Sequence, residues 1–172
     1  MKIRLERHLL PFRYIFYIGL IAFSFIKKNC NNKIPKVNNL EENDIRLIKN
    51  VKNSLPKLIE LINKQDLNEY IKTVVNFSFE ANKYFNDSEP WTFKKKDPVR
   101  MNEILFTIVE QIKNISILLN PIIPISTKKV LDTINISDKD ISIESIKNDK
   151  ILNCSLELKS LDILFKKVED DN

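Results

Sequence analysis

The stretch ANKYFNDSEPWTFKKKDPVRMNEILFTIVEQIKNISILLNPIIPISTKKVLDTI, residues 81–134, decides the fold of this chain. Asp97-Pro98 marks a helix start, because an aspartate side chain accepts free N–H groups of the first turn and proline fits the first helical position. Apolar residues then recur every three or four positions, which is typical of one helix face, until Asn120-Pro121 ends the pattern. The sequence therefore predicts a helix over residues 98–119. Its apolar face is Met101, Ile104, Leu105, Ile108, Val109, Ile112, Ile115 and Leu119.

Helical periodicity continues upstream of this stretch. Apolar residues in steps of three and four predict a helix over residues 43–64, which Pro56 should kink or split. Asp66 and Glu69 have the spacing of a capping box and predict a second helix that ends near Asn86. The pattern as a whole predicts an all-α antiparallel helical bundle.

Downstream, a short helix is expected over residues 126–134. The periodicity then weakens, and residues 137–172 are expected to form an irregular C-terminal extension that packs back on the bundle. The apolar residues Ile163, Leu164 and Phe165 are the candidates for pinning this tail.

Composition excludes several kinds of site. Gly19 is the single glycine among 172 residues, so neither a phosphate-binding P-loop nor a dinucleotide fingerprint can be built. His8 is the single histidine, and Cys30 and Cys154 lie too far apart for a zinc motif. We therefore expect no catalytic residues, no metal site and two reduced, partly buried thiols in a cytoplasmic protein.

The overall charge mildly favours anionic partners. The net charge is +5 and 30% of the residues are charged, while 43% are hydrophobic, enough for a core. Nucleic acid and an acidic membrane surface both fit a basic protein.

The N-terminal segment, residues 1–21, differs from the rest of the chain. Basic residues precede the thirteen-residue apolar run Tyr14–Ile26, and Lys27 and Lys28 follow it. This run is shorter than the roughly 20 residues of a membrane-spanning helix. Three interpretations remain: a buried first helix, a segment foreign to the fold, or a membrane anchor. The bundle itself is expected over residues 22–136.

The block ANKYFNDSEPW, followed by KKKDP and a long apolar helix ending in LNPIIP, resembles one family specifically. It is similar to the C-terminal anticodon-binding domain of methionyl-tRNA synthetase, a class I aminoacyl-tRNA synthetase. FSFIKKNCNNKIP (residues 23–35) and LFKKVED (residues 164–170) are also similar to family segments, so the resemblance covers roughly residues 22–170. It implies a helical bundle that binds the CAU anticodon, with methionine-specific tRNA as the partner.

The resemblance assigns Trp91 to contact an anticodon base. An indole can stack on an exposed base for roughly 1–3 kcal/mol, and Pro90 fixes the backbone just before the ring. The alternative is that Trp91 packs against the following helix.

Other residues of the same motif are expected to assist. Lys94, Lys95 and Lys96 are candidates for contacts with the tRNA backbone, unless they are simply solvated. Asn82 and Tyr84 match the motif as well, and we expect them to support the Trp91 loop by hydrogen bonds.

The chain departs from the family in two respects. It has no HIGH-type or KMSKS-type signature, and ISTKK at residues 125–129 is helix sequence. The ATP and magnesium used by the family enzyme therefore have no site here, and the chain alone is not expected to activate methionine. A separate catalytic chain is a possible partner.

The second departure lies in the first helix. The family positions for an asparagine and an arginine that read the anticodon align with Tyr17 and Ile21, and an isoleucine cannot hydrogen-bond a base. One hypothesis covers both departures: the chain is the C-terminal part of a longer synthetase gene, interrupted near this helix. The alternatives from other classes are a small membrane-anchored helical protein and a protein-binding helical scaffold.

Overall fold

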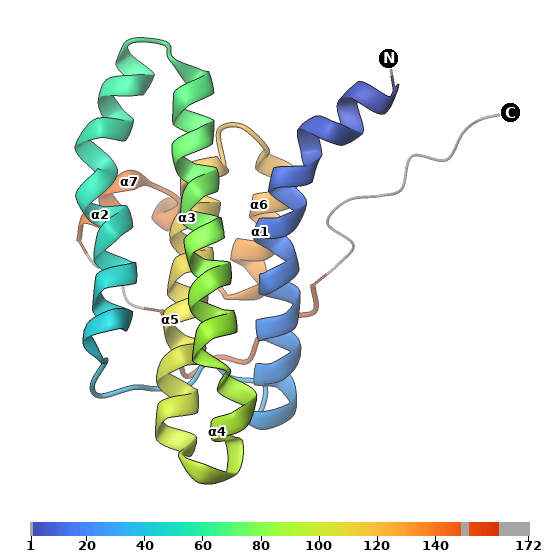
Figure 1. Ribbon diagram of the computed structural model, residues 1–172, viewed down its shortest axis with the longest axis vertical. Coiled ribbons are helices and arrows are strands. Elements are labelled where there is room, and N and C mark those ends of the chain that lie inside the picture. Colours follow the sequence, from blue (N-terminus) through green and yellow to red (C-terminus); the bar gives the residue numbers. More distant parts are fainter. Residues whose placement is uncertain (1, 149–151, 162–172) are drawn as a thin grey trace, which may run out of the picture.

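The computed structural model describes residues 2–148 and 152–161, with side chains from Phe16 onward. The described part is an antiparallel helical bundle, which confirms the predicted all-α class (Figure 1). The helices are α1 (Lys2–Asn29), α2 (Glu42–Asn63), α3 (Leu67–Ser88), α4 (Pro90–Lys96), α5 (Pro98–Leu119), α6 (Pro124–Thr133) and α7 (Ile143–Lys147), with a 3-10 turn at Asp138–Asp140.

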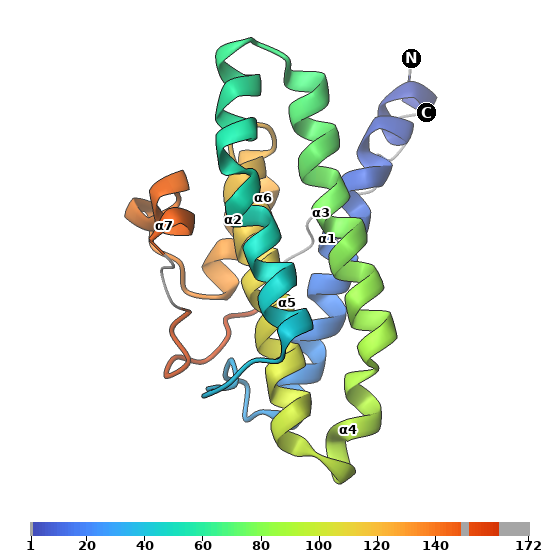
Figure 2. The ribbon, with the colours of Figure 1, turned by 60° about the vertical axis from the view of Figure 1, so that its left-hand side comes forward.

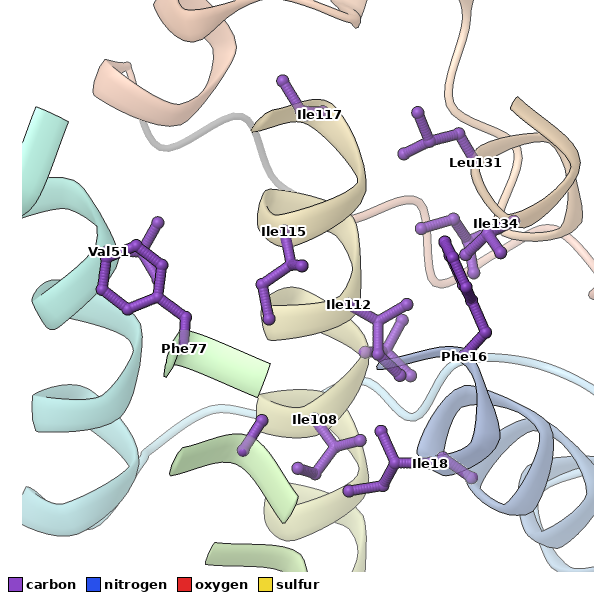
Figure 3. Close-up of a cluster of buried hydrophobic side chains, with 14 of the residues drawn as sticks. Phe16, Ile18, Val51, Phe77, Ile108, Ile112, Ile115, Ile117, Leu131 and Ile134 are labelled. Atoms are coloured by element: carbon purple, nitrogen blue, oxygen red, sulfur yellow. The ribbon is translucent and has the colours of Figure 1, made fainter. Parts of the chain in front are cut away.

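Helix α5 is the centre of the bundle. It contacts α1, α2, α3, α4, α6 and α7, while α3 lies between α1 and α2 on one side of it (Figures 1 and 2). Residues 111–119 of α5 are all buried, so this helix has no solvent-facing side over its last turns. Figure 3 shows the side chains that meet there, from α1 (Phe16, Ile18), α2 (Val51), α3 (Phe77), α5 (Ile108, Ile112, Ile115, Ile117) and α6 (Leu131, Ile134).

Two of the predicted helix starts have the expected hydrogen bonds. The Asp66 carboxylate accepts from the Glu69 backbone N–H at 3.1 Å, and the Asp97 carboxylate accepts from the Arg100 N–H at 3.0 Å. Helix α2 continues through Pro56 as one element, so this proline does not split it. Pro56 is exposed, and its ring faces away from the core.

Helix α1 packs against the bundle through its C-terminal half. It runs without a break through residue 21, contacts α3 and α5, and buries a set of apolar side chains between residues 16 and 26. Among the described helices, none is long and apolar enough to cross a membrane. The burial of side chains between residues 16 and 26 is what the interpretation as a buried first helix expects of this part of the run. The buried side chains are Phe16, Ile18, Ala22, Phe23 and Ile26.

Part of the C-terminal extension is held against the body of the protein. The Leu158 N–H donates to the Asn32 carbonyl at 2.8 Å, and the Lys159 N–H donates to the Thr133 carbonyl at 3.0 Å. Leu158 is buried by this arrangement. The predicted anchor at residues 163–165 and the LFKKVED segment lie outside the described residues.

Candidate nucleic-acid interface

A sharp corner at Glu89 places the predicted site at one end of the bundle. Glu89 has a left-handed backbone, with φ 41° and ψ 59°, and it both ends α3 and precedes α4. Pro90 follows as the first residue of α4 and is buried. The sequence suggested a loop around Trp91, and this was wrong, because residues 90–96 form a short helix directly after the corner.

Trp91 is partly anchored and partly free. Its ring meets Phe85 edge to face, with ring centroids 5.9 Å apart and planes inclined by 74°. Phe85 is buried, so it provides a fixed support for the indole. Trp91 itself remains 46% exposed. The ring contact is with α3, the helix before Trp91, whereas the alternative named the helix after it, and the residue still presents a surface to solvent.

Lys94, Lys95 and Lys96 form the last turn of α4 and are all exposed. Within the part of the chain that the structure describes, no carboxylate lies within ion-pair distance of their ammonium groups. Their charges are favourable at a helix C-terminus, where backbone carbonyls carry partial negative charge. They place three positive charges within five residues of the exposed indole.

Tyr84 contributes to a buried network that fixes this end of the bundle. Its hydroxyl donates to Asp44 at 2.5 Å, and the Arg100 guanidinium donates to both Asp44 oxygens at 2.5 and 2.9 Å. The Asp44 side chain is completely buried. The network joins α2, α3 and the start of α5, and thus holds the two helices that flank α4. Tyr84 therefore bonds α2 and not the Trp91 segment itself.

Burial and hydrogen bonding act in opposite directions on Asp44. Burial alone would raise the pKa of its carboxyl, but the bonds from Arg100, Tyr84 and the Glu41 N–H hold that pKa below its usual value. Burial and the neighbouring Asp44 charge raise the pKa of Tyr84. The bonds to Asp44 raise the pKa of Arg100. At neutral pH the network consists of a carboxylate, a guanidinium and a neutral phenol.

The remaining predicted residues lie around the same helices. Asn82 is half-buried on α3. Tyr17 and Ile21 are one turn apart on the outer face of α1 and are 62% and 39% exposed. No cluster of three or more His, Cys, Asp or Glu side chains suitable for a metal ion occurs among the residues with described positions. Cys30 and Cys154 are free and half-buried, as predicted.

Sequence reasoning missed Asp44 and Arg100. They are 56 residues apart, and no sequence motif predicts that they form a pair. A charged residue at the start of a predicted helix is ordinarily solvated, so no signal in the sequence distinguishes this buried pair.

The described chain is a helical bundle with an exposed tryptophan and adjacent lysines at one end. Residues 34–172 match the family described as "Anticodon binding domain of methionyl tRNA ligase". The chain belongs to this family of methionyl-tRNA synthetase domains.

Individual relatives agree with this assignment. Methionine–tRNA ligase of Rickettsia felis is 29% identical over 153 residues, covering 86% of this chain and 30% of the relative. The enzyme of Brucella suis is 32% identical over 111 residues, covering 64% of this chain and 22% of the relative. The chain thus spans less than a third of the length of either relative.

A solved structure has the same fold. The apo form of Mycobacterium tuberculosis methionyl-tRNA synthetase superimposes with a TM-score of 0.82 at 19% identity, covering 90% of this chain and 32% of that one.

Proposed function

We propose that this chain binds the anticodon loop of methionine tRNA, with Trp91 stacking on an anticodon base. The observation that carries the proposal is the indole that is anchored on Phe85 and still 46% exposed, in a chain of the anticodon-binding family. Unpaired bases of an RNA loop expose their faces, and an aromatic ring provides a matching surface. Lys94, Lys95 and Lys96 neutralise nearby phosphates.

Supporting residues set the position of this surface. Pro90 is buried at the corner, and Tyr84 fixes α3 through Asp44. Asn82 lies on α3, eight residues before Pro90, and we assign it a supporting role in the same region. Stacking by itself tolerates any base. Recognition of the CAU sequence therefore requires further contacts, and Tyr17 and Ile21 are poor substitutes for polar side chains that read base edges.

Aminoacylation requires a second component under this proposal. The relatives are methionine–tRNA ligases, and the matching region is about 30% of the Rickettsia felis enzyme. Activation of methionine with ATP and magnesium belongs to a catalytic domain, for which a separate catalytic chain is the proposed source. Translation in the cytoplasm is the setting that this function implies.

The test is a titration of the purified chain with methionine tRNA and with a tRNA of another anticodon. Trp91 is the single tryptophan, so its fluorescence reports this site directly. We expect quenching by methionine tRNA and weaker quenching by the other tRNA. Because Trp91→Ala removes the fluorophore, its affinity is measured with labelled tRNA by anisotropy.

Loss of stacking should weaken binding by roughly 1–3 kcal/mol, which is about 5- to 150-fold in Kd. Phe79→Ala is the matched control, because Phe79 is an aromatic residue of α3 that is 50% exposed. Equal affinities of the wild-type chain and Trp91→Ala would contradict the proposal, and so would an equal loss in Phe79→Ala.

A further inference from the structure

A groove runs between α2 and α3 on the side of the bundle away from α1. Its volume is about 740 Å³, and its lining residues come from the first half of α2, the last half of α3 and the start of α5. Four cations line it. Arg100 of α5 is paired with Asp44, and the other three are Arg46 and Lys49 from α2 and Lys83 from α3. Lys83 belongs to the ANKYFNDSEPW block, whereas Arg46 and Lys49 lie outside the quoted motifs.

The three cations are electrostatically available. Within the described residues, none of them lies within ion-pair distance of a carboxylate, although Glu80 and Asp87 line the same groove. The Glu80 carboxylate instead accepts bonds from two asparagine amides, those of Asn50 at 2.6 Å and Asn76 at 2.9 Å.

The other half of the same seam is different. There Glu69 of α3 is paired with Lys57 of α2 at 3.9 Å and with Lys72 of its own helix at 3.4 Å. The positive groups of the seam between α2 and α3 are therefore ion-paired at one end and lie outside ion-pair distance at the other. An anion would be attracted to the unpaired end.

That unpaired end leads to the Trp91 surface. Ser88 and Arg100 line the groove, and Glu89 is the one residue between Ser88 and α4. In Figure 1 the N-terminal end of α2 and the C-terminal end of α3 lie toward the same end of the bundle as α4. An RNA chain with one base stacked on Trp91 can therefore continue toward the groove.

We propose that this groove binds the sugar–phosphate backbone of the RNA whose anticodon is held at Trp91, an inference that rests on the proposed function. Arg46 can form a paired contact with two phosphate oxygens, while Lys49 and Lys83 act as point charges. Asn43 and Asn53 also line the groove, and their amides can donate to phosphate oxygens or 2′-hydroxyls. These contacts position the RNA and do not read its sequence.

The test uses the triple variant Arg46→Gln, Lys49→Gln and Lys83→Gln in the full chain. The control variant is Lys33→Gln, Lys139→Gln and Lys159→Gln, which removes as many charges from exposed positions outside the groove. Affinity for methionine tRNA is measured by anisotropy at several salt concentrations. Each lost phosphate contact lowers the slope of log K against log salt by about 0.7–0.9.

We expect the groove variant to lose about 2 in this slope, while the control variant loses less than 1 and Trp91 is still quenched at saturation. Acetylation footprinting should also find Lys49 and Lys83 protected by tRNA and Lys139 unprotected. Equal slopes for the two variants, or equal acetylation with and without tRNA, would overturn the groove proposal alone. A wild-type chain that does not bind tRNA would overturn the proposed function, and this inference with it.

Discussion

Asp44 is a buried carboxylate whose two oxygens both accept hydrogen bonds and whose charge is paired with Arg100. The Arg100 guanidinium bonds both of its oxygens, the Tyr84 hydroxyl donates to one, and the Glu41 N–H donates to the other at 3.0 Å. An unpaired charge at this depth would be strongly destabilising. Removal of either Asp44 or Arg100 alone would therefore leave the other charge buried without a partner and destabilise the fold. Replacement of both by well-packed apolar residues is often neutral for stability.

Asp44→Asn tests this dependence. The amide presents an N–H₂ group toward donors of Arg100 or Tyr84, so at pH 7 we expect a loss of about 3 kcal/mol in the free energy of unfolding. Because the folded pKa of Asp44 is lowered, its contribution is present above the unfolded pKa of about 3.9 and is lost as pH falls through the folded value. The difference between wild type and variant should therefore shrink below about pH 4.

Urea unfolding at pH 7 and pH 3 measures this change. Asp87→Asn is the control, since Asp87 is exposed and should change stability by less than about 0.5 kcal/mol. A difference between wild type and Asp44→Asn that is the same at both pH values would show that Asp44 is not the titrating group.

Tyr70 makes the opposite pH prediction. Its hydroxyl donates to the Leu118 carbonyl at 2.7 Å, and burial raises its pKa to about 12. The unfolded tyrosine ionises near pH 10, so stability is complete below pH 10 and falls as pH rises toward 12. Tyr70→Phe should cost about 1 kcal/mol at pH 7 and make the decline above pH 10 shallower.

Thermal unfolding followed by circular dichroism between pH 7 and pH 11 is a suitable measurement. Tyr17→Phe is the control at neutral pH, because Tyr17 is 62% exposed. An alkaline decline of unchanged steepness in Tyr70→Phe would assign that decline to other groups. Tyr84, whose pKa is also raised, is the next candidate.

At the scale of elements, the α3–α4 corner sets the direction of Trp91. Glu89 adopts φ 41° immediately before a proline, and a non-glycine residue is strained there. All of its described hydrogen bonds use backbone atoms, including acceptance from the Thr92 N–H at 2.9 Å. The strained backbone of Glu89 thus serves to turn the chain at the corner, and it does not serve to place the Glu89 side chain in a contact.

Glu89→Gly should therefore raise the free energy of unfolding by about 1 kcal/mol, since glycine adopts this backbone without steric cost. The same replacement in the interior of α2, Lys49→Gly, should lower it by about 1 kcal/mol. Both are measured by thermal unfolding. A loss of stability in Glu89→Gly would mean that the corner is held by the side chain after all.

The elements were predictable where their signals are local. Asp97-Pro98 marks the start of α5 because the cap and the proline act within one turn. Helix α4 was not predictable, because Glu89 is not one of the residues that usually signal a left-handed corner. The Asp44–Arg100 pair was also hidden, since it depends on how α2 and α5 pack. For the site, Trp91 could be named in advance, but its support on Phe85 could not.

At the scale of the whole molecule, one core connects nearly all of the described chain. Buried apolar side chains from Phe16 in α1 to Leu158 in the C-terminal extension belong to a single cluster. The last turns of α5 are enclosed by neighbours on every side. The extension therefore completes the core, and its removal would expose part of it.

Leu158→Ala tests whether the extension stabilises the whole bundle. The Leu158 side chain is 7% exposed, and its backbone bonds to Asn32 are kept by alanine. Loss of the buried side chain should cost about 2–3 kcal/mol, with roughly 2–4 °C in Tm for each kcal/mol in a chain of this size. Leu156→Ala is the matched control, because Leu156 is 46% exposed and should shift Tm little.

If the extension lay loosely on the bundle, both variants would unfold at the wild-type temperature. If it is part of the single core, Leu158→Ala should lower Tm while unfolding remains one cooperative transition, with far-UV circular dichroism and Trp91 fluorescence changing together.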